Sequence, residues 1–213
     1  MKILNYLLIF SALILIASCG QPTVSFTEPQ PADANDLKQF PKRIQGHYVS
    51  ADDSSLLIID ANLIQRIYDF HYKVHPNQLD NHFVITDDAI INEETAEKIP
   101  FAKDGDSLII HEYGVDTIFM INMDNVLRKS KGYYFLNIRT DEDKWTVRKI
   151  DLKKGELKIS QISRQYELDN LMEISETPED TIPPESFNIN KKQFNEFVKK
   201  GGFSDTEVFV RLK

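Results

Sequence analysis

The fold class is decided by one stretch of the chain, Leu63-Ile64-Gln65-Arg66-Ile67-Tyr68-Asp69-Phe70-His71-Tyr72-Lys73-Val74-His75. Its even positions are mostly apolar or aromatic, and its odd positions are mostly polar. A period of two residues places alternate side chains on opposite faces of a β-strand. The stretch therefore predicts a half-buried strand.

Shorter segments repeat this strand-like pattern between residues 43 and 175. Apolar runs at residues 56–59 and 108–110 follow polar turns. Residues 133–163 read as a three-stranded meander with strands at 133–140, 144–152 and 156–163. The apolar positions of its middle strand change phase, which predicts a β-bulge near Lys149. Residues 87–101 are ambiguous and stay unassigned.

One helix is expected near the end of the chain, over about residues 191–200. Asn190 is a suitable N-cap, Gln193 completes a capping box, and Gly201 ends the helix. Residues 207–212 then alternate again. The sequence thus predicts a mainly β fold, an antiparallel β-barrel or sandwich with one C-terminal helix followed by a last strand, as a single domain over residues 41–213.

Composition limits the partners. The chain has 213 residues, of which 41% are hydrophobic, and its 13 Phe and 8 Tyr are sufficient for a sizeable core. The formal net charge of −8 disfavours binding to nucleic acid phosphates and to an anionic membrane surface. We therefore expect no nucleic acid partner, and any membrane attachment has to come from a lipid.

The N-terminus has the layout of a secretory signal over residues 1–18. Lys2 precedes an apolar run at residues 3–16, and small residues lead to Cys19, which is the only cysteine. The apolar run is too short for a helix that crosses about 30 Å of hydrocarbon, which needs roughly 20 residues. A single thiol also has no partner for a disulfide.

The tetrapeptide Ile16-Ala17-Ser18-Cys19 resembles the lipobox of bacterial lipoprotein precursors. In that family Leu is commoner than Ile at the first position, and Gly or Ala is commoner than Ser at the third. The resemblance implies lipidation of Cys19: a diacylglyceryl group on its sulfur, cleavage before it, and acylation of the new amino group. The alternatives are an ordinary cleaved signal with a chance cysteine and an uncleaved anchor.

Residues 19–40 are then expected to form a lipidated flexible tether, because Pro22, Pro29 and Pro31 interrupt a stretch with little periodicity. Gly20, and not Asp, follows the cysteine, and residues 21–25 contain no acid. By resemblance to lipoproteins, this favours a lipid-anchored protein of the cell envelope, at the outer membrane and facing the periplasm. In a host with one membrane the protein would face outward.

Clusters of polar residues were considered as catalytic or metal sites. His71 and His75, with His82 nearby, are the only histidine cluster, but on a strand the first two lie about 13 Å apart, too far to share one metal ion. The acidic groups at residues 52–53, 87–88, 104–106 and 141–143 fit turns better than a calcium loop. The chain has no nucleophile elbow, P-loop or dinucleotide motif. We therefore expect no metal, no cofactor and no enzymatic activity.

The surplus of Tyr and Phe residues can form either the core or the lining of a ligand cavity. Gly46-His47-Tyr48 faintly resembles the opening of a lipocalin-type barrel, with Tyr48 where that family has Trp, and implies no particular ligand. We expect a non-enzymatic module that binds a small apolar ligand or an envelope protein, and the alternative is an envelope hydrolase without a recognisable motif. The aromatic residues concerned are Tyr48, Tyr68, Phe70, Tyr72, Tyr113, Phe119, Tyr133, Tyr134 and Phe135.

The lipobox assignment makes a direct prediction. Cys19→Ala removes the acceptor thiol, so the variant should accumulate as an unprocessed precursor and should not incorporate a fatty-acid probe. The measurement is metabolic labelling followed by gel analysis, with the unchanged chain as control. Labelling that persists in the variant would contradict the assignment.

Overall fold

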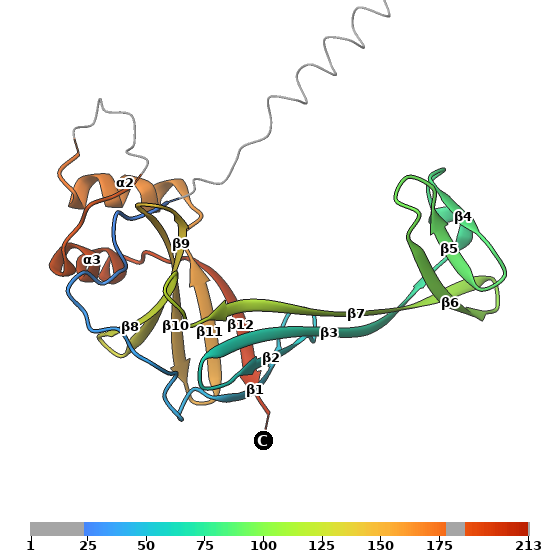
Figure 1. Ribbon diagram of the computed structural model, residues 1–213, viewed down its shortest axis with the longest axis horizontal. Coiled ribbons are helices and arrows are strands. Elements are labelled where there is room, and N and C mark those ends of the chain that lie inside the picture. Colours follow the sequence, from blue (N-terminus) through green and yellow to red (C-terminus); the bar gives the residue numbers. More distant parts are fainter. Residues whose placement is uncertain (1–23, 178–185, 213) are drawn as a thin grey trace, which may run out of the picture. The chain divides into compact units, whose positions relative to one another are not determined.

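The computed structural model describes residues 24–177 and 186–212, so the expected signal at residues 1–18 and Cys19 lie outside the described residues. Within the described part, twelve strands form an antiparallel open sheet in the order β4-β5-β6-β7-β3-β2-β1-β12-β11-β10-β9-β8 (Figure 1). The predicted mainly β class, with a helix before the last strand, is confirmed. Periodicity did not reveal that the sheet is open, with β4 and β8 at its ends.

The chain forms two compact units where the sequence predicted one domain over residues 41–213. Unit 1 is the described part of Met1–Lys38 together with Ile121–Glu207. Unit 2 is Gln39–Met120 together with the described part of Val208–Lys213. The last strand, β12 (Asp205–Arg211), contributes its first residues to unit 1 and its last residues to unit 2.

Unit 1 contains the predicted meander, which is confirmed. Two helices follow it, one of which the sequence did not predict. The elements are β8 (Asn125–Ser130), β9 (Tyr133–Asp141), β10 (Lys144–Lys153), β11 (Glu156–Gln161), α2 (Gln165–Ile174) and α3 (Lys191–Lys199).

Helix α3 begins as expected. The side chain of Asn190 accepts from the backbone N–H groups of Lys192 and Gln193, and the Gln193 side chain accepts from the Asn190 N–H, so the capping box is complete. Helix α2 lacks a Ser, Thr, Asp or Asn cap, because Arg164 precedes it. Its local signals are Glu167, whose carboxylate accepts from the Arg164 N–H over 2.9 Å, and the helical spacing of apolar residues at positions 168, 171 and 172.

The phase change in β10 has a different cause from the predicted bulge near Lys149. Pairing of β10 with both neighbours is regular there, and the register shift lies between Lys144 and Trp145. Val147 and Ile150 point to opposite faces of the strand, and both are buried. A strand covered on both faces does not need to keep its apolar residues on one side.

Residues 24–40 are not a flexible tether, which corrects that prediction for the described part of residues 19–40. Phe26 is fully buried and exchanges two backbone hydrogen bonds of 2.8 Å with Trp145. Further along, the Leu37 N–H donates to the Leu127 carbonyl over 2.8 Å. The apolar residues between the prolines therefore pack onto unit 1.

The core of unit 1 is largely aromatic. The ring of Phe194 on α3 meets Phe135 on β9 at 5.0 Å and Phe26 at 5.9 Å, both edge to face. Phe197 and Phe203 pack 5.6 Å apart beside them. Because these rings come from the N-terminal segment, the meander and the last helix, the cluster joins segments that are far apart in the sequence.

Unit 2 holds the strand that the opening stretch predicted, since β3 spans Leu63–Val74. It pairs along its whole length with the longest strand, β7 (Ser107–Met120). The unassigned residues 87–101 contain β5 and the first part of β6. The other elements of unit 2 are β1 (Gly46–Ser50), β2 (Leu56–Ile59), the short 3₁₀ helix η2 (Pro76–Gln78), β4 (Phe83–Ile85), β5 (Ala89–Asn92) and β6 (Lys98–Asp104).

The aromatic core of unit 1 predicts that Gly202 cannot be replaced. A Cβ at this position would overlap the ring of the buried Phe197. Gly202→Ala should therefore lower the free energy of unfolding by about 1–3 kcal/mol, the usual range for overpacking a core. Urea denaturation measures this change.

The matched control is Gly114→Ala in β7, where the nearest atom to an added Cβ is 3.9 Å away. That variant should change the free energy of unfolding by less than about 1 kcal/mol, the usual range for an Ala that fits without strain. Equal effects of the two substitutions would show that the Phe197 contact is unimportant.

Candidate functional site

Three features are candidates for a functional site: a largely buried polar clamp, a lysine-rimmed hollow and an exposed aromatic ribbon. No helix in the described part of the chain is long and apolar enough to span a membrane. The described residues also include no group of three or more His, Cys, Asp or Glu side chains placed to hold a metal ion. The site therefore has to be found from shape, exposure and charge.

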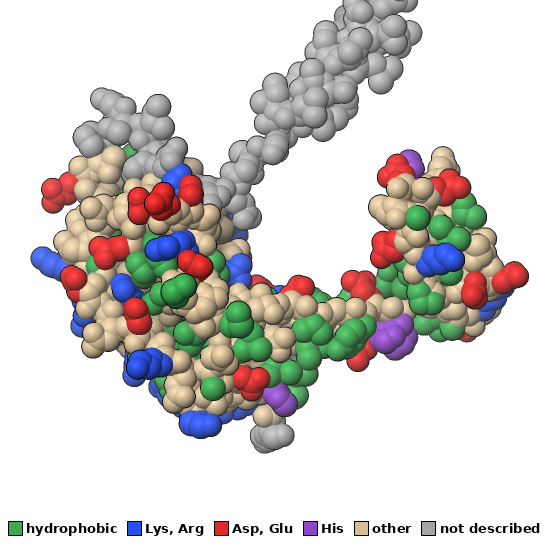
Figure 2. Space-filling model, in the orientation of Figure 1, with side chains coloured by type: hydrophobic (Ala, Val, Ile, Leu, Met, Phe, Trp, Pro, Cys, Tyr) green, Lys and Arg blue, Asp and Glu red, His purple; other side chains and the backbone are tan. Residues whose placement is uncertain are grey.

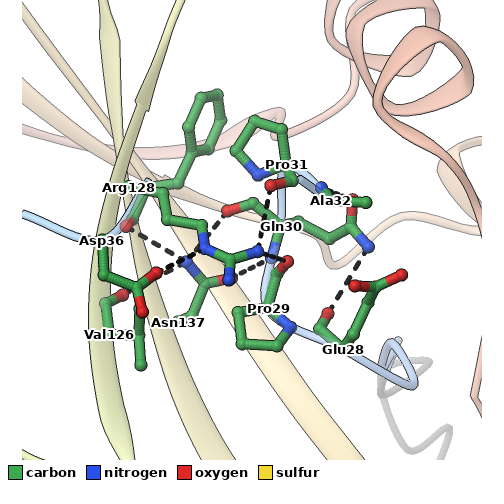
Figure 3. A network of polar contacts seen from close by, with 10 residues as sticks. Glu28, Pro29, Gln30, Pro31, Ala32, Asp36, Val126, Arg128 and Asn137 are labelled. Atoms are coloured by element: carbon green, nitrogen blue, oxygen red, sulfur yellow. Dashed lines mark hydrogen bonds and ion pairs between the residues drawn. The ribbon is translucent and has the colours of Figure 1, made fainter. Parts of the chain in front are cut away.

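The polar clamp holds the N-terminal segment against the meander (Figure 3). The Asn137 amide on β9 donates to the Gln30 carbonyl over 2.9 Å and accepts from the Gln30 N–H over 2.5 Å. It also donates to the carbonyl of Val126 over 3.2 Å. Asn137 and Gln30 are fully buried, so this amide satisfies backbone groups that water cannot reach.

Arg128 completes the clamp. Its guanidinium donates to the Asp36 carboxylate over 2.7 Å and to the carbonyls of Pro29 and Pro31 (Figure 3). An arginine offers five donors in a rigid fork, and here they are used on the chain's own backbone. The clamp is therefore structural, and it fixes the segment that begins at Val24.

The lysine-rimmed hollow lies between the β8–β9 turn and the exposed side of α3. It is open to solvent and has a volume of about 480 Å³. Lys131 and Gly132 form the turn, with φ of 50° and 91°, the left-handed conformation that two-residue hairpins favour. The residues that line the hollow are Lys131, Tyr133, Phe135, Asn195, Val198 and Lys199.

The hollow is positively charged although the chain is acidic. Two lysines and no carboxylate are among its lining residues. A third lysine, Lys149, lies behind it, with its Nζ 5.5 Å from the centre of the Tyr133 ring. Burial lowers the pKa of Lys149, and the charges of Asp151 and Glu167 offset part of this effect. A charged hollow with an apolar wall concentrates ligands of opposite charge.

Asn195 holds its position in the hollow through bonds within the chain. Its Nδ2 donates to the Lys191 carbonyl over 2.7 Å, and its Oδ1 lies 3.0 Å from the Ser130 hydroxyl. Tyr133 and Phe135 provide the apolar wall on the sheet side, and Val198 provides it on the helix side. This arrangement is suited to binding and holds no paired acid and base for catalysis among the residues that line it.

The aromatic ribbon is the middle part of the β3–β7 pair in unit 2, residues 68–73 and 111–115. Strand β2 pairs with β3 only as far as Ile67, and β6 pairs with β7 only as far as Ile110. Between these points, at residues 68–71 of β3 and 111–114 of β7, the sheet is two strands wide. Phe70, Tyr72 and Tyr113 are 37%, 38% and 63% exposed. Figure 2 shows hydrophobic side chains along this stretch.

The predicted histidine cluster is dispersed as expected for a strand. His71 is in β3 and stacks on His111 of β7 with ring centres 4.3 Å apart, whereas His75 lies beyond the strand and caps η2. His111 Nε2 lies 2.8 Å from an Asp69 carboxylate oxygen. His82 Nδ1 lies 3.0 Å from a Glu94 carboxylate oxygen.

The acidic group at residues 52–53 has a structural role in the β1–β2 turn. Burial raises the pKa of Asp53, but hydrogen bonds from Ser55 and Ser50 and the charge of Arg66 outweigh it and lower this pKa to about 2. The Ser55 N–H and hydroxyl donate to one carboxylate oxygen over 3.0 and 2.6 Å. Arg66 donates to the other oxygen over 2.9 Å.

The aromatic surplus divides into three groups. One group is core, one lines the hollow, and one lies on the ribbon. The sequence identified all of these aromatic residues as candidates, but it did not identify Lys131, Asn195 or Lys199 as site residues. The only sequence signals at the two lysines are the turn glycine beside Lys131 and the helix end at Lys199. The core group is Tyr48, Phe119, Tyr134 and Phe135, of which Phe135 also lines the hollow beside Tyr133, and the ribbon has Tyr68, Phe70, Tyr72 and Tyr113.

The clamp predicts the consequence of losing one amide. Asn137→Ala leaves the buried N–H and carbonyl of Gln30 without a partner, so it should lower the free energy of unfolding by about 2–4 kcal/mol. It should also speed hydrogen exchange in residues 24–38. The control is Asn125→Ala on β8, at a half-buried position. Protection of residues 24–38 that equals the unchanged chain would contradict the role of the clamp.

Comparisons with protein-family models, curated proteins and solved structures give no match. The resemblance to lipoprotein precursors over residues 16–19 and the faint resemblance to lipocalins at residues 46–48 therefore stay predictions.

Proposed function

We propose that the chain is a lipid-anchored protein of the cell envelope that binds a small amphipathic anion in the lysine-rimmed hollow. The observation that supports this is a pair of lysines facing an apolar wall without a carboxylate among the lining residues. Such a hollow suits a carboxylate or sulfonate joined to an apolar body. The volume lies in the range of small-molecule sites.

The charge of the hollow is not used within the chain. Among the described residues, neither Lys131 nor Lys199 has an ion-pair partner. The next residue, Lys200, lies 3.0 Å from Glu173, and Lys73, Lys153 and Lys158 also have acidic partners. Two unpaired lysines on one hollow favour an anionic ligand.

The proposed lipid anchor would act over a short distance. The described part of unit 1 begins at Val24, which is buried, and only residues 20–23 separate it from Cys19. The five Cα–Cα steps from Cys19 to Val24 span at most about 17 Å. A site on a unit held this near the bilayer suits a ligand that comes from the membrane, such as a free fatty acid.

Outer-membrane attachment facing the periplasm is part of the same proposal. It rests on Gly20 and on the absence of acids in residues 21–25. The hydrolase alternative has no specific observation in its favour among the described residues, and the lack of enzymatic activity stays a prediction.

The proposal predicts binding of dodecanoate to the chain without residues 1–19, measured by isothermal titration calorimetry. The double variant Lys131→Ala/Lys199→Ala should bind roughly 25-fold more weakly, because each exposed charge-assisted hydrogen bond is worth about 1 kcal/mol. Dodecylamine, which has the same chain and the opposite charge, should bind more weakly than dodecanoate.

The matched control is Lys144→Ala, which removes the same charge from unit 1 beside Asp141, at the end of β9 that lies about 25 Å along the strand from Tyr133. It should leave dodecanoate affinity within about twofold, since exposed charges beyond a Debye length are screened. Equal losses in the control and the double variant would show that net charge, and not the hollow, determines binding. An unchanged affinity of the double variant would exclude the hollow as the site.

A further inference from the structure

We propose that the aromatic ribbon is a self-association surface on which β3 pairs antiparallel with β3 of a second copy of this chain. The two-fold axis passes through His71 and stands perpendicular to the ribbon. This inference concerns unit 2 and does not depend on the proposed ligand. It rests on an open strand edge and on a sequence that is complementary to itself when the strand is reversed.

The edge of β3 is open over residues 69–73. Strand β2 occupies this edge as far as Ile67, and beyond that point β7 is the one described strand that pairs with β3. All five residues from 69 to 73 are exposed. A strand edge presents unpaired N–H and carbonyl groups, which form a template for another strand.

Reversal of the strand about His71 pairs complementary side chains. On one face, Phe70 lies opposite Tyr72 of the second copy, and Tyr72 lies opposite its Phe70. On the other face, Asp69 lies opposite Lys73 of the second copy, and the symmetry repeats this ion pair. Aromatic pairs and opposite charges are the cross-strand neighbours that stabilise antiparallel sheets.

The axis at His71 also uses the whole open edge, because His71 is the middle of residues 69–73. Even positions have to face even positions for the aromatic side chains of both copies to share one face. Moving the axis to Tyr72 would place His71 opposite Lys73 of the second copy and remove both ion pairs. Moving it to Phe70 would leave Lys73 opposite Ile67, which β2 already occupies.

The edge of β7 does not have this complementarity. A pairing about Tyr113, the middle of residues 111–115, would place Glu112 opposite Gly114 and His111 opposite Val115 of the second copy, so it would form no ion pair. A pairing about Gly114 would place Glu112 opposite Asp116, and like charges directly opposite each other destabilise a sheet. The two edges of the ribbon therefore differ, and the geometry favours β3.

Pairing would also stabilise the ribbon. Two strands with both faces in water are marginally stable, whereas four strands with an aromatic face are much more so. A strand pair of this length buries less than a standard interface, so we expect the dimer to exchange rapidly. The interface is isologous and closes after two copies.

Covalent capture tests the register. In the full-length chain, purified in detergent, His71→Cys places the two thiols opposite each other at the axis, within reach of a short bis-maleimide. We expect most of this variant to migrate at twice the monomer mass. Asp69→Cys alone should not cross-link efficiently, but mixed with Lys73→Cys it should. Tyr113→Cys, on β7, is the exposed control.

The unchanged chain is a second control, because it has only Cys19. A cross-linked dimer of the unchanged chain would mean that Cys19 carries a free thiol, which contradicts its lipidation. The pairing would then be judged from the cross-linked fraction of each variant relative to that of the unchanged chain. Cross-linking of Tyr113→Cys as strong as that of His71→Cys, or no dimer from His71→Cys, would overturn the proposed pairing.

Charge exchange separates the interface from the fold. In the His71→Cys background, Asp69→Lys should reduce the cross-linked fraction about tenfold, since two attractive pairs become repulsive. Adding Lys73→Asp should restore it. The bonds of Asp69 to His111 and of Lys73 to Asp104 stay broken in this double exchange. Restoration therefore reports pairing between copies, and failure to restore would overturn the proposal.

Discussion

The structure of unit 1 depends on one buried amide. Asn137 lies among apolar side chains and provides both a donor and an acceptor to the backbone of Gln30. Burial of these polar groups is tolerated because each has its partner. With Gln30 held, Phe26 can cover the aromatic cluster around Phe194. An interaction between residues 107 positions apart thus holds the segment around Gln30 on unit 1.

The features that the sequence predicted are those that local periodicity encodes. Strand β3, the meander and the capping box of α3 are each specified by neighbours within a few residues. The segment at residues 24–38 was misjudged because its partners are distant: Phe26 pairs with Trp145, and Arg128 binds its carbonyls. Helix α2 was missed because Arg164 provides no side-chain cap at its start, although the Glu167 carboxylate accepts from the neighbouring Arg164 N–H as well as from the distant Ser204 N–H.

The hollow could not be predicted from the sequence, because its two walls, on β9 and α3, come together only when the core packs. Tyr133 was identified as a candidate for lining a cavity, and it does line the hollow. Lys131 and Lys199 look like an ordinary turn residue and an ordinary helix C-terminal residue, the positions that lysine commonly takes. Only the packing of α3 against β9 through Phe194 and Phe135 places them at one opening.

The alternation of β3 correctly predicted a strand but not which part of it is buried. Ile64 is buried, whereas Phe70 and Tyr72 on the same face are exposed. At these two residues β7 is the one described strand that pairs with β3, so they also lack cross-strand neighbours on the other edge. A period of two specifies that one face of the strand is apolar, but it does not specify which element covers that face. In the proposed pairing, the second copy widens the sheet at this point and joins the aromatic faces of both chains. The aromatic residues of β3 that are exposed in a single chain would then have cross-strand neighbours from the second copy.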